Sequence, residues 1–411
     1  MHGGAWGGRS FRLFFFGQGV SALGDRIVSV ALAFAVLDLT GSVSDLGAVL
    51  AAQTVPVVVF VLLGGIWSDR LSRRRVMLAS DIVRAAAQGA SAALLVSGAA
   101  HVWQLVVLQA LYGTAQGFFG PAAVALVPET VATADLQQAN ALMAVSQNVA
   151  NVVGPALAGV LVASIGPGWG LGVDAGTFLA SAASLAMMRV DAAARAERSS
   201  MGHELRDGWR AFRSRTWLWA SVAGFMAGNA LGFSPMQVLG PEVARRSLGG
   251  PAAWAAISTA SGIGAVLGGS VGMRWRPRFP LRAIFAWSLV GTPALLALLA
   301  DAAPLAALVT AAVVSGATLT LLNLTWFTVV QREIPRDELS RVSSWDTLGS
   351  YAINPVGLAV AGPVAVTVGI AATLYAAAAF FVLITLIVLA VPSVRDLAIR
   401  TPDQHAPTPP P

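Results

Sequence analysis

The sequence predicts an all-α integral membrane protein with twelve transmembrane helices in two pseudo-symmetric six-helix bundles. Hydrophobic residues make up 56% of the 411 residues and charged residues only 11%, whereas soluble domains carry about 25% charged residues. The apolar residues form runs long enough to cross a bilayer, which takes about 20 residues per helix. The basic residues gather in alternate connections between these runs, as is typical of a multi-pass membrane protein.

Twelve apolar runs follow one another along the chain. They cover residues 11–38, 44–67, 75–97, 102–126, 137–164, 170–189, 216–240, 252–273, 281–300, 304–330, 342–366 and 368–392. The longest connection is polar and separates the sixth run from the seventh. We therefore expect five parts: a cytoplasmic N-terminus at 1–10, an N-terminal bundle at 11–189, a cytoplasmic linker with an amphipathic helix at 190–215, a C-terminal bundle at 216–392 and a disordered cytoplasmic tail at 393–411.

The distribution of arginine orients these spans. The chain has 26 lysine and arginine residues, and all of them are arginine. On the side of the termini lie 22 of them, whereas the opposite connections hold only Arg245 and Arg246. Cytoplasmic connections carry the excess of basic residues. We therefore expect both termini in the cytoplasm.

The two sets of six spans resemble each other at an offset of about 200 residues. Gly65 near the end of the second run corresponds to Gly269 near the end of the eighth, and Pro155 in the fifth run corresponds to Pro355 in the eleventh. Two halves with the same topology commonly enclose a site near the bilayer midplane. The repeat therefore predicts transport by alternating access.

Several classes of function are excluded by what the chain lacks. It has no cysteine, so disulfides and thiolate metal sites are not expected. The four histidines lie at positions 2, 101, 203 and 405, in termini or connections, which argues against a metal site or a catalytic triad. No phosphate-binding loop is present. We expect a non-enzyme without cofactor or metal, powered by an ion gradient, and no nucleic-acid partner.

Three charged residues inside the apolar runs are candidates for proton coupling. Asp25 lies near the middle of the first run, where an ionised carboxylate costs about 2.5–3.5 kcal/mol. It must therefore pair, face water or bind a proton. A proton carrier and a permanent pair with Arg84 or Arg26 are the two interpretations. Asp81 and Arg84 are three residues apart in the third run and can pair on one helix face.

The stretch GGIWSDRLSRRR, residues 64–75, places an acid among arginines at the cytoplasmic end of the second run. One interpretation is a positive-inside anchor. The other is a gate, in which Asp69 accepts hydrogen bonds from a helix N-terminus in the other half. Arg73 and Arg74 would then bridge carboxylates or lipid phosphates, and Asp346 could meet Arg73 across the halves. Asp346 and Asp174 also lie near predicted helix starts, which they could stabilise.

This stretch resembles the cytoplasmic loop motif of the major facilitator superfamily, G-x-L-A-D-R-x-G-R-K. The residues that fit are Gly65, Asp69, Arg70, Arg73 and Arg74. Gly154, Pro155 and Gly159 in the fifth run resemble a second motif, which the family associates with antiporters. The resemblance covers all twelve spans and is strongest to the branch of macrolide and multidrug efflux pumps and the enterobactin exporter. Gln109 stands where related drug exporters often have an arginine.

Polar and flexible side chains in the runs predict a substrate cavity between the bundles. The candidates are Gln109, Tyr112, Gln116, Asn148, Asn151, Met226, Asn229, Met236, Asn323, Trp326 and Asn354. Together they would form a mostly apolar pocket for a bulky amphipathic substrate. For each residue alone, helix packing is the alternative.

The resemblance implies a secondary active transporter in a bacterial plasma membrane. It would export hydrophobic or amphipathic drugs or natural products in exchange for protons. A lysophospholipid flippase or a siderophore exporter of the same fold is one alternative, and a non-transporting receptor or scaffold is another. The expected partners are a lipophilic small molecule, protons and membrane lipids, and we expect a monomer.

Overall fold

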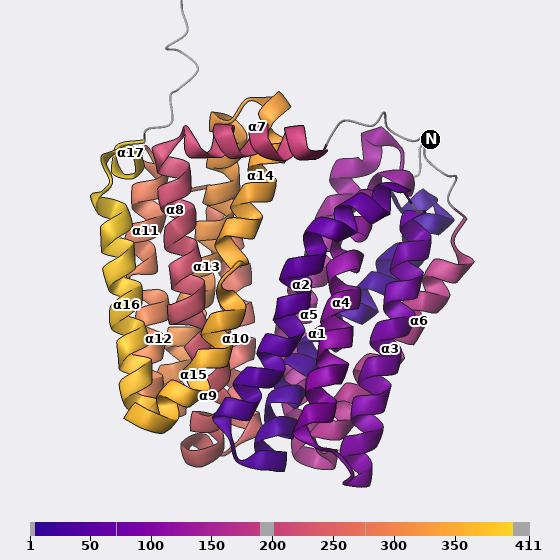
Figure 1. The fold of residues 1–411 in the computed structure, drawn as a ribbon, viewed down its shortest axis with the longest axis vertical. Coiled ribbons are helices and arrows are strands. Elements are labelled where there is room, and N and C mark those ends of the chain that lie inside the picture. Colours follow the sequence, from indigo (N-terminus) through magenta and orange to yellow (C-terminus); the bar gives the residue numbers. More distant parts are fainter. Residues whose placement is uncertain (1–4, 71, 190–200, 276, 398–411) are drawn as a thin grey trace, which may run out of the picture.

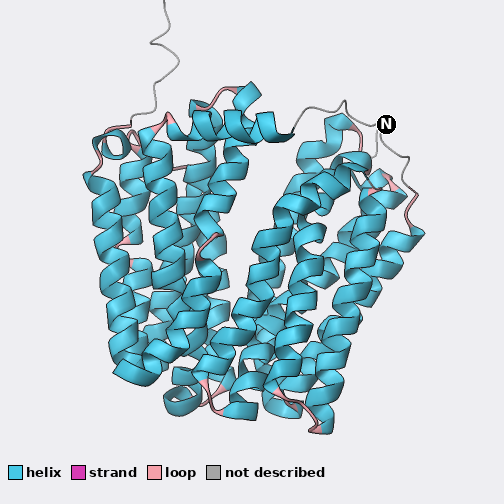
Figure 2. Cartoon of the chain, in the orientation of Figure 1, coloured by secondary structure: helices cyan, strands magenta, loops and turns pink. Residues whose placement is uncertain are grey.

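The computed structural model describes residues 5–70, 72–189, 201–275 and 277–397. The side chains of residues 5, 61–70, 201–205, 336, 337 and 340 lie outside this description. Helices dominate this part of the chain, and it contains no strand (Figure 2). The predicted all-α membrane fold of twelve spans is confirmed.

The N-terminal half contains one helix for each of the six predicted spans. They are α1 (Arg9–Thr40), α2 (Val43–Arg70), α3 (Arg73–Ser97), α4 (Val102–Leu126), α5 (Leu136–Ile165) and α6 (Pro167–Met187). Three short 3₁₀ helices flank them: η1 (Ala5–Gly7), η2 (Val127–Glu129) and η3 (Thr133–Asp135). The left-handed glycines Gly41 and Gly98 end α1 and α3, a conformation that a glycine adopts without strain. The predicted spans therefore become six nearly continuous helices.

Three predicted spans of the C-terminal half consist of two or more shorter helices. The seventh is α8 (Thr216–Ala227), η4 (Gly228–Phe233), α9 (Ser234–Val243) and η5 (Ala244–Leu248); the ninth is α11 (Pro280–Ser288) and α12 (Gly291–Ala300); the eleventh is α14 (Arg336–Tyr351) and α15 (Asn354–Val368). The other spans are α10 (Pro251–Gly272), α13 (Leu305–Glu333) and α16 (Ile370–Ala390), followed by α17 (Pro392–Arg395). Pro293 and Pro355 follow two of the interruptions, because proline has no N–H for the helical hydrogen bond. The segments η4 and η5 are π-helical.

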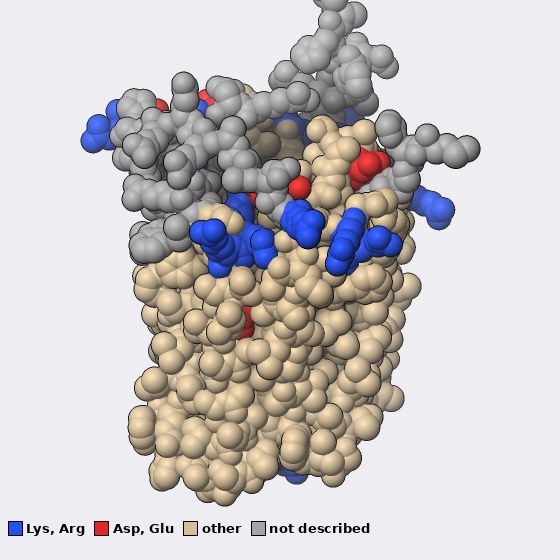
Figure 3. Space-filling model, turned by 90° about the vertical axis from the view of Figure 1, so that its right-hand side faces the viewer, with Lys and Arg blue, Asp and Glu red and all other residues tan. Residues whose placement is uncertain are grey.

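Apolar length alone identifies ten of these spans in the described residues. The two exceptions are α3, which carries Asp81 and Arg84, and the seventh span, which is split into short segments. Helix α7 (Met201–Arg213) lies across the bundle at the terminus side, against α14 (Figure 1). Figure 3 shows arginine side chains in a band near this side of one face, with a mainly uncharged surface beyond it.

Glycines allow close helix packing inside each half. A Cβ atom on Gly113 of α4 would collide with the carbonyl of Gln53 in α2, and one on Gly264 of α10 would collide with the carbonyl of Val313 in α13. Small residues let membrane helices approach closely, and van der Waals contact then stabilises the pair. These contacts fix the rotation of each helix and so decide which side chains face the interior.

The two halves meet mainly through two helix pairs, α2 with α15 and α5 with α10. Gly47 of α2 lies against Leu358 of α15, and Gly159 of α5 lies against Ala255 of α10. These residues belong to the parts of the helices farther from the termini, and Figure 1 shows the two bundles converging there and diverging toward the terminus side. The closure between the halves is therefore on the side away from the termini.

Candidate functional site

A cluster of buried polar side chains lies inside the N-terminal half. Asp81, Arg84 and Gln88 of α3, Gln109 of α4 and Asp174 of α6 are each at most 1% exposed. Burying polar groups is unfavourable unless they have hydrogen-bond partners. The contacts among them therefore account for their presence in an apolar bundle.

Asp25 of α1 borders the same cavity as Arg84 and binds Tyr112 of α4. The Tyr112 hydroxyl donates a hydrogen bond of 2.8 Å to Oδ1 of Asp25. Asp25 is half-buried, and no ion pair within 4 Å involves it in the described part of the chain. Arg26, its neighbour in sequence, is exposed. The direct pairs of Asp25 with Arg84 or Arg26 that the sequence left open are therefore not formed in this structure.

Arg84 forms the pair with Asp81 that the three-residue spacing predicted. The two side chains form a buried ion pair, and Nη1 of Arg84 also donates to Oε1 of Gln116 at 2.5 Å. The guanidinium carbon lies 3.9 Å from the centre of the Phe119 ring and 4.2 Å from that of Phe178. Aromatic faces attract a cation, and the attraction is stronger away from water. Arg84 is therefore held on several sides.

A second chain of hydrogen bonds starts at Gln109. Its Nε2 donates to Oε1 of Gln88 at 3.0 Å, and Nε2 of Gln88 donates to Oδ2 of Asp174 at 3.0 Å. The Thr177 hydroxyl donates to the backbone carbonyl of Asp174. Asp174 is the eighth residue of α6, so the expectation that it stabilises the start of this helix is wrong. Its partner Gln88 was missed, although it lies one turn after Arg84 on the same helix face.

A cavity of about 210 Å³ opens beside this cluster. Asp25, Arg84 and Gln116 border it, together with Gln18, Ser21, Ser146 and Gln147 from α1 and α5. Phe119 and Met143 supply much of its apolar surface. The lining is thus more polar than the mostly apolar pocket expected from the sequence, and Gln18 and Gln147 were not among the predicted residues.

The other predicted cavity residues are spread over the molecule. Asn148 and Asn323 are exposed, and Asn323 bonds to the carbonyl of Leu319 in its own helix. Asn151 is half-buried and accepts a hydrogen bond from Gln147 at 3.3 Å. Met226 is half-buried, and Met236 packs against the main apolar core. None of these five borders the 210 Å³ cavity.

Of the remaining three predicted cavity residues, two lie at the interruption in the eleventh span and the third binds Asp346 in α14. Nδ2 of Asn229 donates to the carbonyl of Ser350 at 3.1 Å, and the Ser234 hydroxyl donates to Oδ1 of Asn354 at 2.7 Å. Nε1 of Trp326 donates to Oδ2 of Asp346 at 3.0 Å. These side chains therefore hold helices of the C-terminal half together.

The gate residues whose side chains are described bind within the N-terminal half. Nη1 of Arg73 binds Glu129 at 2.7 Å and the carbonyl of Ala125 at 2.8 Å. Arg74 donates to the carbonyls of Leu185 and Ala186 at the end of α6, both at 2.6 Å. The suggested contact between Arg73 and Asp346 is therefore absent from this structure, because Arg73 faces α4 and Asp346 faces α13.

The other gate residues lie at the end of α2. The backbone of Gly65, Asp69 and Arg70 belongs to this helix, but their side chains lie outside the described residues. In the motif of the fifth span, Gly154 and Pro155 are buried, and Gly154 packs against Arg26 and Leu23 of α1. Gly159 packs instead against Ala255 in the other half. This motif therefore contacts helices of both halves.

A model of the protein family described as "Transmembrane secretion effector" matches residues 7–410. The chain belongs to this family, within the major facilitator superfamily. It is a transporter and not an enzyme. The chain is 26% identical over 406 residues to the multidrug efflux pump Tap of Mycolicibacterium fortuitum, which covers 95% of this chain and 97% of Tap. It is also 26% identical over 151 residues to macrolide efflux protein A of Streptococcus pyogenes, which covers 37% of each chain.

Solved structures of other transporters share the fold. The nucleoside transporter NupG superimposes with a TM-score of 0.76 at 14% identity, covering 93% of this transporter and 98% of NupG. A bacterial homologue of the human lysosomal transporter Spinster gives a TM-score of 0.69 at 16% identity, covering 94% and 97% of the two chains. At these identities the likeness concerns the architecture alone.

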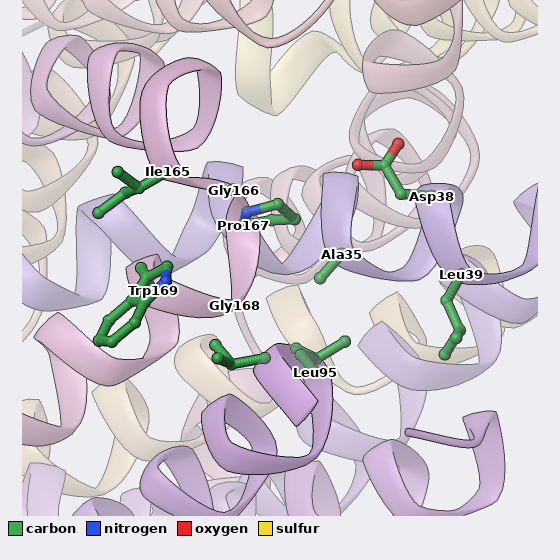
Figure 4. Close-up of a pocket in the computed structure, with 10 residues that line it drawn as sticks. Ala35, Asp38, Leu39, Leu95, Ile165, Gly166, Pro167, Gly168 and Trp169 are labelled. Carbon is green, nitrogen blue, oxygen red and sulfur yellow. The ribbon is translucent and has the colours of Figure 1, made fainter. Parts of the chain in front are cut away.

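A larger cavity of the transporter lies away from the buried polar cluster. It measures about 350 Å³ and is bordered by the ends of α1, α3, α5 and α6 that are distant from the termini. Figure 4 shows Asp38 and Trp169 on different sides of it, with Ile165 above Trp169 and Leu95 at the lower edge. We place the candidate site at the smaller cavity, because the enclosed carboxyl and guanidinium groups border that one.

Proposed function

We propose that the transporter exports a hydrophobic or amphipathic small molecule in exchange for protons. Full-length similarity to a multidrug efflux pump supports export of such compounds. The observation that carries the proposal is the position of Asp25, a carboxyl deep in α1 that borders a cavity without an ion-pair partner in the described chain. The gradient of protons across the membrane is the proposed source of energy.

The charge balance of the cluster supports proton binding. Asp25, Asp81 and Asp174 lie in the same bundle as Arg84, the cation bound to Asp81. Each further ionised carboxylate at membrane depth costs about 2.5–3.5 kcal/mol. Bound protons would remove this cost for Asp25 and Asp174. Asp25 is the member that borders the cavity and is the least enclosed, so we assign the exchange of the proton to it, with Asp81 and Arg84 as its fixed counterpart.

The cavity lining indicates how a substrate could compete with this proton. A cationic or hydrogen-bonding group near Asp25 would take the place of the proton and of the Tyr112 hydroxyl. The amides of Gln18, Gln116 and Gln147 offer donors and acceptors for polar groups of the ligand, while Phe119 contacts its apolar part. An amphipathic ligand satisfies both kinds of surface.

We also propose how the two bundles move, where the linker and the termini lie, and which residues close the cytoplasmic side. The bundles at 11–189 and 216–392 rock against each other, and the linker at 190–215 joins them on the cytoplasmic side of a bacterial plasma membrane. Residues 1–10 and 393–411 are also cytoplasmic. Asp69, with Gly65 and Arg70, closes the cytoplasmic side in the opposite conformation, while Arg73 and Arg74 anchor α3 to its own half. The transporter works as a monomer.

Transport by purified protein in proteoliposomes tests the proposal. Wild type and Asp25→Asn are compared against lipophilic cations, neutral macrolides, siderophores and lysophospholipids, with an imposed pH gradient. We expect the wild type to move cations or macrolides against their gradient, and Asp25→Asn to lose accumulation by more than tenfold. Asp396→Asn, which changes a carboxylate beside Arg395 near the end of the described chain, is the control.

Three outcomes would contradict this proposal. Accumulation that continues unchanged after collapse of the pH gradient would overturn proton coupling. Movement of lysophospholipids or siderophores alone would replace the proposed substrate class. Equal transport by wild type and Asp25→Asn would remove Asp25 from the mechanism.

A further inference from the structure

The C-terminal half contains a buried carboxyl of its own. Asp346 of α14 is 5% exposed and accepts hydrogen bonds from Nε1 of Trp326 at 3.0 Å and from the Ser350 hydroxyl at 3.5 Å. Trp326 is itself enclosed by Trp217 and Phe225, whose ring centres lie 5.8 and 4.9 Å away. Two neutral donors thus stabilise this acid inside an aromatic cluster.

No basic residue forms an ion pair with Asp346 in the described part of the chain. The elements that pack against α14 are α7, α8, α13 and η4. Helices α8 and η4 contain no ionisable side chain, and those of α13, Arg332 and Glu333, lie in its last turn beyond Trp326. From α7, Asp207 faces Arg341 at 3.7 Å.

The other charged groups of α14 whose side chains are described, Glu338 and Arg341, also lie elsewhere. Arg341 is five residues before Asp346 and therefore points about 140° away around the helix. Glu338 binds Arg215 at 2.7 Å. Tyr351 is the other ionisable neighbour of Asp346. Among the described side chains, the charge of Asp346 therefore has no fixed counterpart, unlike that of Asp81.

Asp346 lies five residues before Tyr351, the last residue of α14 before the interruption of the eleventh span. Helix α14 ends at Tyr351 and α15 begins at Asn354, and Ser350 lies between Asp346 and this gap. The Ser350 hydroxyl contacts Asp346, while its carbonyl accepts a hydrogen bond from Asn229 of the π-helical segment η4. Irregular membrane helices need side-chain partners for their freed backbone groups. Ser350 thus connects Asp346 with the hydrogen bond that joins Asn229 to the end of α14.

The helix beyond the gap forms part of the closure between the halves. In α15, Leu358 lies against Gly47 and Gly362 lies against the backbone of Ser44, both in α2. A change in the angle between α14 and α15 would move these contacts. Asp346, before the interruption, is therefore connected through α15 to the contacts with α2 that close the two halves.

We propose that Asp346 is a second proton-binding residue of the transporter and that its protonation moves α15 relative to α2. As a carboxylate, Asp346 accepts a hydrogen bond from the Ser350 hydroxyl at 3.5 Å. After binding one proton, the carboxyl O–H becomes a donor that the same Ser350 oxygen can accept. The Ser350 hydroxyl must then direct its own hydrogen elsewhere, which changes the hydrogen bonding at the gap. The proposal rests on the proposed transport function, but it concerns a different half and a different step.

Distances between spin labels test this link without any substrate. Because the chain has no cysteine, Ala99→Cys beside α3 and Val366→Cys in α15 provide two exposed labelling sites on the side away from the termini. Pulsed electron paramagnetic resonance on the full chain in lipid nanodiscs, between pH 5 and 9, measures the distance between the two labels. We expect a pH-dependent shift between two distance populations in the wild type and in Asp25→Asn.

Variants of Asp346 and of its hydrogen-bond donor Trp326 test the proposal. Asp346→Asn should remain in the low-pH distribution at all pH values. Trp326→Phe removes one donor to the carboxylate, so the midpoint of the transition should move upward by roughly half to one pH unit. An unchanged transition in both variants would overturn the proposal. If Asp346→Asn does not fold, the Trp326→Phe midpoint decides.

The same labels separate this proposal from the export function. Failure of drug transport with an intact, Asp346-dependent distance change would contradict the export function alone. Loss of the transition in Asp25→Asn, with no effect of Asp346→Asn, would assign the movement to protonation of Asp25 and contradict the role of Asp346. Asp396→Asn is the control for a change of an exposed carboxylate.

Discussion

Arg84 shows how single residues define the candidate site. It combines an ion pair with Asp81, a hydrogen bond to Gln116 and contact with the faces of Phe119 and Phe178. Its Nε has no hydrogen-bond partner among the described atoms, although the side chain is 1% exposed. A buried donor without a partner is unfavourable, and an ordered water or a functional role can account for it. Arg84 is therefore both an anchor of the bundle and a residue that borders the cavity.

Removing this guanidinium should destabilise the N-terminal half. Arg84→Gln leaves Asp81 buried without its partner, which costs about 3–5 kcal/mol for a broken buried pair. The double variant Asp81→Asn with Arg84→Gln should recover part of this loss, because no charge is then left unpaired. Denaturant unfolding of all four proteins in detergent measures the coupling. Strictly additive effects would show that the pair contributes no specific stability.

Tyr112 gives a test of the environment of Asp25. Tyr112→Phe removes the hydroxyl that donates to Oδ1 of Asp25 and preserves the ring packed on Phe178. The lost hydrogen bond stabilised the ionised carboxylate, so the proton should be released at higher pH. We expect the pH profile of transport to move upward by roughly half to one pH unit. The same measurement on Tyr375→Phe, whose hydroxyl contacts Asp301 instead, should give the wild-type profile.

At the scale of elements, the two halves differ in the regularity of their helices. The spans of the N-terminal half are nearly continuous, whereas the seventh, ninth and eleventh spans are interrupted or contain π-helical segments. The polar residues Asn229, Ser234 and Asn354 satisfy groups at these irregular positions. Such segments occur at functional sites because their backbone can change conformation more readily than a regular helix. The irregular helices are therefore concentrated in the C-terminal half.

The closest helix contacts should not tolerate the addition of even one methyl group. A methyl group on Gly264 would meet the backbone of Val313, which cannot move without displacing α13. We expect Gly264→Ala to lower the free energy of unfolding by about 1–3 kcal/mol. Gly176→Ala in α6 is the matched control, because no atom lies within 4 Å of its added methyl group. The control should be neutral or stabilising, since alanine favours the helix. Thermal unfolding that ranks the two variants in the opposite order would contradict the packing argument.

The whole molecule is closed on the side away from the termini by contacts of α2 with α15 and of α5 with α10. The alternating access that we propose requires that these contacts separate and that others form on the side of the termini. The arginine-rich connections lie on the terminus side, where Arg73 and Arg74 stiffen the N-terminal half. These contacts agree with the proposed movement of each half as a unit about the interface between them.

A cross-link across this interface should stop transport. Gly159 of α5 and Ala255 of α10 are in direct contact, so Gly159→Cys with Ala255→Cys should form a disulfide after a small adjustment. We expect the oxidised protein to lose more than 90% of its transport and the reduced protein to regain it, because the halves can no longer separate there. Full activity of the cross-linked form would show that α5 and α10 stay together during transport. Each single cysteine variant serves as a control.

The sequence alone determined the features that depend on composition and on short spacings. The apolar runs predicted the twelve spans, because crossing a bilayer requires a minimum apolar length. The spacing of Asp81 and Arg84 predicted their pair, because residues three apart share a helix face. The position of Asp25 in its run marked it as a candidate through the cost of charge in the membrane.

Only the tertiary structure decided which helices supply the partners of these residues. The bond of Gln88 to Asp174 joins residues 86 positions apart, and that of Asn229 to Ser350 joins residues 121 apart. Arg73 binds Glu129 instead of Asp346 for the same reason. Contacts between helices depend on their rotation and separation, which close packing at residues such as Gly113 and Gly264 fixes. Hydropathy within a single helix contains no information about that geometry.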